Sequence, residues 1–199
     1  MYEGVDTVIL YEELAYEDTV PVRWQPLNTP LSDDAYNRNV DGNLRLLQAC
    51  AALDEQGQTE KADDDSPHAA DILRLEMKMN LLLDLVGRIL VANQPRPQPT
   101  PIRFNAVGAV FGDTGSALKP GDEGMLEIYL KDCLVEPLRL LGRVANVAAD
   151  GQVKIKFRNP GEAIADLIEK LAFRRHRRQV ADQRQPRAVD PARTGKFRR

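Results

Sequence analysis

The sequence has very few of the residues on which metal sites, disulfide frameworks and many catalytic centres are built. It holds two cysteines and two histidines among 199 residues. Cys50 and Cys133 follow no spacing motif, which indicates a reducing compartment, so we expect a cytoplasmic protein. His68 and His176 have no cysteine or carboxylate at ligand spacing, so we expect no metal site.

The chain also lacks the longer patterns that define membrane proteins and several enzyme classes. No stretch approaches the ~20 consecutive apolar residues that span a bilayer, and the acidic start lacks the positive region of a secretory signal. No Gly-rich phosphate loop opens a helix, and no nucleophile elbow is present. The acidic run 63–65 lacks the glycine and the distal glutamate of a calcium loop, so we interpret it as a solvated linker. We expect a protein without enzymatic activity, cofactor or membrane insertion.

The net charge of -3 conceals a strong asymmetry along the chain. Residues 1–20 carry six acidic residues and no lysine or arginine, whereas residues 174–199 carry ten lysines or arginines against two aspartates. A basic end of this kind is usually a solvated tail, and we expect residues 177–199 to be disordered. The tail has few interleaved aromatics and the remaining chain is acidic, so we do not expect a nucleic-acid partner.

The strongest periodic signal lies between residues 72 and 91, where apolar residues alternate spacings of three and four without a break. This is the a/d heptad pattern of one helix face packing along another. The heptad seam consists of Ile72, Leu75, Met79, Leu82, Val86 and Ile89. Leu83, Leu85 and Leu90 flank it at e and g positions, so the apolar face is wider than a two-stranded zipper requires. We expect this helix to build a homo-oligomer. The alternative is that the seam packs within one chain, on a second helix predicted over 33–55 or on the β domain.

Composition and periodicity divide the chain into five parts. Residues 1–30 contain short β-prone segments that we expect to join the β-barrel, and residues 31–94 form two amphipathic helices that we expect to pair as a hairpin. A Pro-rich spacer follows over residues 95–101. Residues 102–176 contain short alternating strands, the hairpin signal Asp150–Gly151 and a closing helix from Glu162, which together predict a small antiparallel barrel. The basic tail occupies residues 177–199.

The strands and the closing helix follow a recognisable order of motifs. These are PIRFNAVGAVFG, KPGDEGMLEIYL, PLRLLGRVANV, GQVKIKFRNP and EAIADLIEKLAFRRHRRQ. In this order residues 102–173 resemble a PilZ domain, a six-stranded barrel that typically binds the bacterial second messenger cyclic di-GMP. With long helices ahead of these strands, the chain is most similar to the atypical, helix-bearing PilZ branch, whose members form tetramers. The resemblance implies an α+β fold and a tetramer built through the long helices.

The sequence departs from this family where the ligand would bind. The family signature is RxxxR ahead of the barrel plus (D/N)xSxxG at an early strand turn, with arginines that hold phosphates and stack on guanine. Here Arg103 stands in place of the acid or amide, Asn105 in place of the serine, and only Gly108 matches. Arg96 is the only basic residue in the spacer.

Two RxxxR strings lie elsewhere in the chain. Arg174 and Arg178 end the last helix, and with Arg103, Asn105 and Gly108 they are the candidates for cyclic di-GMP binding. Arg139 and Arg143 share one face of a predicted strand, which is typical of a solvated or cross-strand-paired face, with a displaced phosphate site as the alternative.

The sequence therefore predicts a bacterial signalling protein of the PilZ type, without enzymatic activity. We expect it to act as an oligomeric module that contacts an unidentified protein partner in cyclic di-GMP-linked regulation, with degenerate ligand motifs. The alternative is a cyclic di-GMP receptor that binds through a non-standard arginine site.

Overall fold

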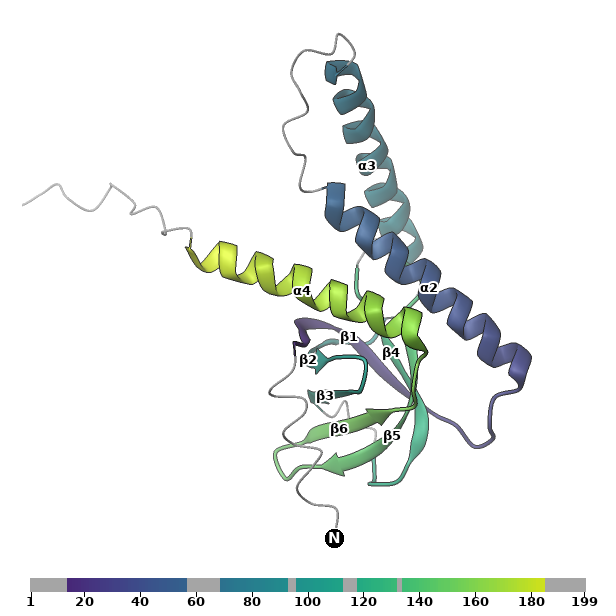
Figure 1. The fold of residues 1–199 in the computed structure, drawn as a ribbon. Helices are drawn as coiled ribbons and strands as arrows, with labels where there is room; N and C mark the ends of the chain where they lie inside the picture. Colours follow the sequence, from purple (N-terminus) through teal and green to yellow (C-terminus); the bar gives the residue numbers. More distant parts are fainter. Residues whose placement is uncertain (1–13, 57–68, 93–95, 113–117, 132–133, 185–199) are drawn as a thin grey trace, which may run out of the picture.

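The computed structural model describes residues 14–56, 69–92, 96–112, 118–131 and 134–184. These residues form a closed barrel of six strands, together with three helices that lie outside it (Figure 1). In chain order the elements are β1 (Tyr16–Pro26), α2 (Asp33–Gln56), α3 (Ala69–Ala92), β2 (Pro99–Phe104), β3 (Gly108–Gly112), β4 (Glu123–Ile128), β5 (Leu138–Val147), β6 (Gln152–Phe157) and α4 (Glu162–Arg184). The predicted α+β class and antiparallel barrel are confirmed.

The barrel closes in the order β1-β2-β3-β6-β5-β4, and every neighbouring pair is antiparallel. Strand β1 closes it by pairing first with β2, over Tyr16–Pro21, and then with β4, over Val22–Pro26. Pro21, which has no N–H to donate, lies where β1 changes partner, and its carbonyl accepts a bond of 3.0 Å from Tyr129 N. One long strand thus serves two ladders.

Strands β1, β5 and β6 bury their residues in a largely alternating pattern, as a half-buried pleat requires, whereas β4 buries Gly124–Ile128 without a break. The inward-facing residues include Val20, Val22 and Trp24 of β1, Leu138, Leu140 and Val144 of β5, and Val153, Ile155 and Phe157 of β6. Gly151 turns the β5–β6 hairpin with a φ of 82°, a conformation that side chains disfavour. The alternation visible in the sequence therefore marks the core correctly.

Helices α2 and α4 cover the barrel, whereas α3 projects away from it (Figure 1). Helix α2 contributes Leu46, Leu47 and Cys50 to the core and packs against α4 and β5. The side chains of the heptad seam are exposed, so α3 does not pack against α2 through this seam within one chain. The expected α2–α3 hairpin is therefore not formed in this way. The apolar face of α2 is already occupied by the barrel and α4, which leaves α3 without its predicted internal partner.

Helix α4 is longer than the sequence suggested. Gly161 directly precedes this helix. The Gly161 backbone N donates to Asn159 Oδ1 at 2.9 Å, and the Gly161 carbonyl accepts a hydrogen bond from Ala165 N at 3.0 Å. The helix continues to Arg184, so residues 177–184, which we expected in a disordered tail, are helical. Contacts of its last turns with β1 and α2, described below, supply the reason.

Several predictions concern residues outside the described ranges. They are the part of the β-prone region 1–30 that precedes residue 14, the linker at 63–65, residues 93–95 at the start of the Pro-rich spacer, His68, Cys133, and the tail beyond residue 184.

Candidate ligand-binding and assembly surfaces

The remnant of the second ligand motif forms the tight turn between β2 and β3. The side-chain oxygen of Asn105 accepts hydrogen bonds from Val107 N at 2.8 Å and Gly108 N at 3.0 Å. The Asn105 backbone N donates to Gly108 O at 3.0 Å. Asn105 is 6% exposed, so its amide is directed into the turn and not toward solvent. Asn105 and Gly108 therefore lie close together because they form the same turn, in which the Asn105 side chain bonds to the backbone.

Arg103, the third residue of this group, forms an ion pair with Glu17 of β1 at 3.0 Å. Arg103 and Arg175 of α4 both line a hollow of about 650 Å³ beside β1, β2 and β3, with Glu17 also in its wall. The structure thus brings Arg103 near Arg175, which the sequence did not single out. Arg174 and Arg178, the predicted pair, are not among the residues that line this hollow.

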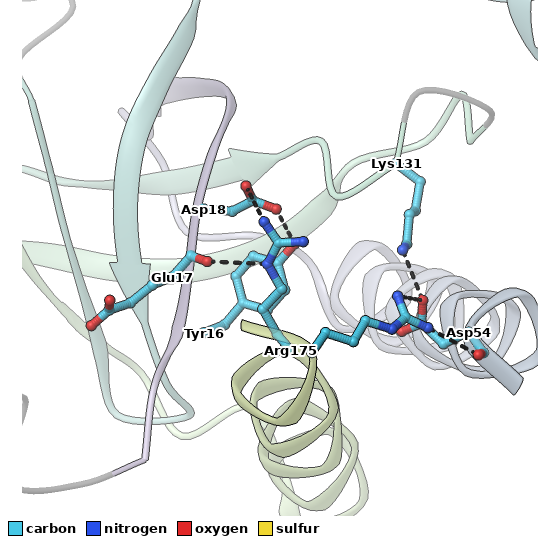
Figure 2. Close-up of polar contacts among 7 residues, drawn as sticks. Tyr16, Glu17, Asp18, Asp54, Lys131 and Arg175 are labelled. Atoms are coloured by element: carbon cyan, nitrogen blue, oxygen red, sulfur yellow. Dashed lines mark hydrogen bonds and ion pairs between the residues drawn. The ribbon is translucent and has the colours of Figure 1, made fainter. Parts of the chain in front are cut away.

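Arg178 is bound by Asp54, near the end of α2. Its guanidinium donates to Asp54 Oδ1 and to the Asp54 backbone carbonyl, each at 2.9 Å. Lys131, which follows β4, donates to the same Oδ1 at 2.8 Å. Figure 2 shows Lys131 and Asp54 facing one another. Asp54 is 5% exposed, and burying a polar group is costly unless it is hydrogen-bonded, as Asp54 is by Arg178 and Lys131.

Arg175 fixes α4 to the start of β1 (Figure 2). It donates to Asp18 Oδ1 at 2.7 Å and to the Glu17 backbone carbonyl at 3.4 Å. Tyr16 OH donates to the other carboxylate oxygen of Asp18 at 2.9 Å. Burial, followed by the negative charge of Asp18, raises the pKa of Tyr16 well above its ordinary value near 10. Arg175 and Arg178 of α4 therefore connect this helix to β1 and to α2.

The RxxxR string in β5 is split between two environments. Arg139 pairs across the strand with Glu127 of β4, Nε to Oε1 at 3.1 Å, and Glu127 is 4% exposed. The Arg139 backbone also exchanges bonds of 2.8 and 2.9 Å with Asn43, which docks α2 on β5. This is the cross-strand pairing that we expected for Arg139. Arg143 lines a separate hollow beside β4, β5 and β6.

Arg96, in the spacer where the family carries its first arginine motif, contacts the barrel. Its guanidinium lies over the Tyr129 ring, 5.2 Å from the centroid, and donates to the backbone carbonyls of Lys131 and Leu134. An arginine used in this way positions the chain segment that joins α3 to β2.

The heptad seam of α3 is the largest exposed apolar surface in the described part of the chain. Its members Ile72, Leu75, Met79, Leu82, Val86 and Ile89 have exposed fractions of 51% to 63%. A second apolar stripe, Leu73, Met77, Leu81 and Leu85, is exposed on the same helix. Soluble monomers rarely expose apolar patches this continuous, so α3 is the candidate interaction surface.

The described residues contain no group of three or more His, Cys, Asp or Glu side chains arranged to hold a metal ion. None of their helices combines the length and the hydropathy of a membrane-crossing segment.

Comparison with known proteins gives one family and one well-matched fold. A family model described as "Atypical PilZ domain, cyclic di-GMP receptor" matches residues 47–185. No curated protein matches the chain. Among solved structures, a tetrameric PilZ domain protein from Xanthomonas campestris, described as self-assembled through a helical bundle, is similar with a TM-score of 0.69 and 24% identity. The similarity covers 86% of this chain and 92% of that one.

Proposed function

The chain belongs to the atypical PilZ domain family of cyclic di-GMP receptors, and from that premise we propose that it acts as an oligomeric protein-interaction module in cyclic di-GMP-linked signalling. Its role is that of a receptor-type domain without catalysis. We propose a cytoplasmic location and an unidentified protein partner, and no nucleic-acid partner. The division into residues 1–30, 31–94, 95–101, 102–176 and 177–199 remains part of the proposal, with two corrected bounds: β2 already begins at Pro99, inside the expected spacer, and the last helix ends at Arg184.

The observation that carries this proposal is the exposed heptad seam of α3. Burying six large apolar side chains is worth roughly 10 kcal/mol per chain before the costs of association. A heptad pattern is self-complementary, so a second copy of α3 is the natural cover. The exposed Leu83 and Leu85 at e and g positions widen the face beyond what a dimer covers. This supports the tetramer, the state given for the Xanthomonas campestris protein.

Sedimentation velocity of wild type and of Leu82→Asp tests the assembly. A charge at a buried d position would be left desolvated and unpaired, so we expect the mass of the variant to fall. Asn80→Asp is the matched control, because it adds the same charge to the same helix at an exposed position outside both apolar stripes. Equal masses for Leu82→Asp and wild type would overturn assembly through the seam.

A cyclic di-GMP receptor with a non-standard arginine site remains the second candidate. What favours it is the pair of arginines, Arg103 and Arg175, in the wall of one hollow. Against it, Arg103 and Arg178 are paired with carboxylates, and Asn105 and Gly108 serve the turn. Arg174 lies half-buried on α4.

Isothermal titration with cyclic di-GMP separates the two candidates. We expect no heat of binding for the interaction module. Micromolar binding would favour the receptor, and Arg174→Ala with Arg178→Ala would then test the helix pair. Thermal unfolding must accompany that variant, because Arg178 also binds Asp54.

A further inference from the structure

The hollow beside β1, β2 and β3 has arginines in its wall that acidic residues of the same chain already bind. The wall holds Arg103 of β2 and Arg175 of α4, together with Glu17 and Asp18 of β1. Its volume of about 650 Å³ is within the range of small-molecule sites. The chemistry of the hollow therefore depends on which anion the two arginines hold.

Glu17 holds Arg103 from the neighbouring strand. The two residues lie directly opposite one another in the β1–β2 register, and Nη1 of Arg103 is 3.0 Å from Oε1 of Glu17. The side chain of Glu17 is 52% exposed, and that of Arg103 is 28% exposed. The carboxylate is thus the more accessible partner, and an anion that approaches Arg103 meets its negative charge.

Asp18 and the backbone of Glu17 hold Arg175 (Figure 2). Nη2 of Arg175 donates to Asp18 Oδ1 at 2.7 Å, and Nε of Arg175 donates to the Glu17 carbonyl at 3.4 Å. Arg103 and Arg175 therefore both contact Glu17, one at its side chain and the other at its backbone. Two guanidinium groups that share one residue in this way are near enough for a single ligand to contact both.

The strand segment that carries the two acids is itself fixed against α4. Gln179, one helical turn beyond Arg175, donates to the same Glu17 carbonyl at 3.2 Å. Tyr16 OH donates to the second carboxylate oxygen of Asp18 at 2.9 Å, which orients that side chain toward Arg175. The pairing of the arginines with β1 is thus supported by several contacts around it.

Guanidinium groups bind phosphate through paired, charge-assisted hydrogen bonds. Two of them beside one residue fit a ligand with adjacent anionic groups, such as a pyrophosphate. A carboxylate uses the same donors, so Glu17 and Asp18 occupy the places that phosphate oxygens would take. Their two negative charges also repel an anion at short distance.

We propose that Glu17 and Asp18 close a binding site for a phosphate-bearing anion between Arg103 and Arg175, so that the wild-type chain binds such an anion only weakly. The inference goes beyond the interaction module and does not depend on assembly through α3. It gives a physical reason for the absence of binding heat that we expect for the wild type, because the arginines that favour the second candidate function are held by the chain itself.

Isothermal titration of the full chain with pyrophosphate and with cyclic di-GMP tests the closure in Glu17→Gln with Asp18→Asn. The two amides keep the shape of the side chains and remove both negative charges. We expect at least tenfold tighter binding of pyrophosphate than in wild type, since two competing carboxylates and their repulsion are lost. Adding Arg103→Ala should return the affinity toward the wild-type value. A parallel gain for cyclic di-GMP would assign the opened site to that ligand as well.

Asp166→Asn with Glu169→Gln is the matched control, because it changes the net charge by the same amount on the exposed face of α4. It should leave the affinity unchanged. Equal affinities for wild type and the Glu17→Gln, Asp18→Asn variant, or an equal gain in the control, would overturn the proposal.

Thermal unfolding shows whether the double variant is folded. Glu17→Gln alone keeps the contacts of Asp18 with Tyr16 and Arg175, and it should still bind pyrophosphate about threefold more tightly than wild type. If the double variant does not fold, an unchanged affinity in this single variant would overturn the proposal. Assembly is measured as mass in the Leu82→Asp variant and closure as heat in these variants, so the two proposals fail separately.

Discussion

At the scale of single residues, Asn105 closes the β2–β3 turn with its side-chain oxygen, which accepts from two backbone amides. The family signature has a serine at this position, and a hydroxyl and an amide offer different geometry to a ligand. In this chain the side-chain oxygen of Asn105 stabilises the turn, which forms although the serine of the family signature is absent.

Asn105→Ala should lower the free energy of unfolding by about 1–3 kcal/mol, because two buried or half-buried amides lose their acceptor. Urea unfolding measures the difference. Asn105→Asp keeps an acceptor oxygen in the same place and should cost clearly less. Equal losses in the two variants would contradict the role that we assign to this oxygen.

Ionisation of Tyr16 should lower the free energy of unfolding at alkaline pH. Burial and the neighbouring Asp18 raise the pKa of the folded phenol, so its contribution is complete below the unfolded pKa near 10 and is lost as pH rises above it. Between pH 10 and pH 11 the wild type should lose about 1 kcal/mol more than Tyr16→Phe, which has no phenol to ionise at this position. Urea unfolding of both proteins at the two pH values measures this, and parallel losses would contradict the effect.

The sequence could not predict which residues the candidate site residues would contact. Arg103, Asn105 and Gly108 can be found from the spacing of a motif. The partner of Arg178, however, is Asp54, which is 124 positions away in the chain. Such a pair depends on how α2 and α4 are placed by the core, and no local pattern encodes it. The prediction of Arg174 and Arg178 as a ligand pair likewise rests on their spacing in the sequence alone.

At the scale of elements, polar side chains of α4 hold it to the barrel and to α2. Arg175 and Gln179 contact β1, and Arg178 contacts α2. These tertiary contacts explain why the helix continues to Arg184 although its sequence has the charge of a tail. Through α4, the same contacts also link α2 to β1.

Asp54→Ala should destabilise the chain by about 2 kcal/mol, because Lys131 and Arg178 would lose their shared carboxylate in a half-buried site. Asp166→Ala is the control, since among the described residues Asp166 pairs only with Lys170, on the exposed face of α4, and its loss should cost about 0.5 kcal/mol or less. Thermal unfolding compares the two variants. Equal, small effects would contradict the role of Asp54 as the link between α2, α4 and Lys131.

Helix α3 could be predicted from the sequence in its type, face and approximate bounds, because a heptad pattern is local. Its partner could not be predicted, since the same pattern fits a hairpin within one chain and a bundle between chains. The structure removes the first option for the single chain, because α2 is already packed on β5 and α4 and the seam is exposed.

At the scale of the whole molecule, the barrel was predictable in class from the alternating strands and the family resemblance. The closure by β1 was not, because a strand that pairs first with β2 and then with β4 shows the same alternation as one with a single partner. The molecule is thus a closed barrel from which one apolar helix projects, and its most exposed apolar surface is also its most regular sequence pattern.

Assembly through that helix is the central claim, and the mass of the wild-type protein in solution tests it most directly. Sedimentation equilibrium at tens of micromolar chain should give a tetramer, and four chains of 22.3 kDa have a mass of about 89 kDa. A single species of 22.3 kDa under the same conditions would contradict the account.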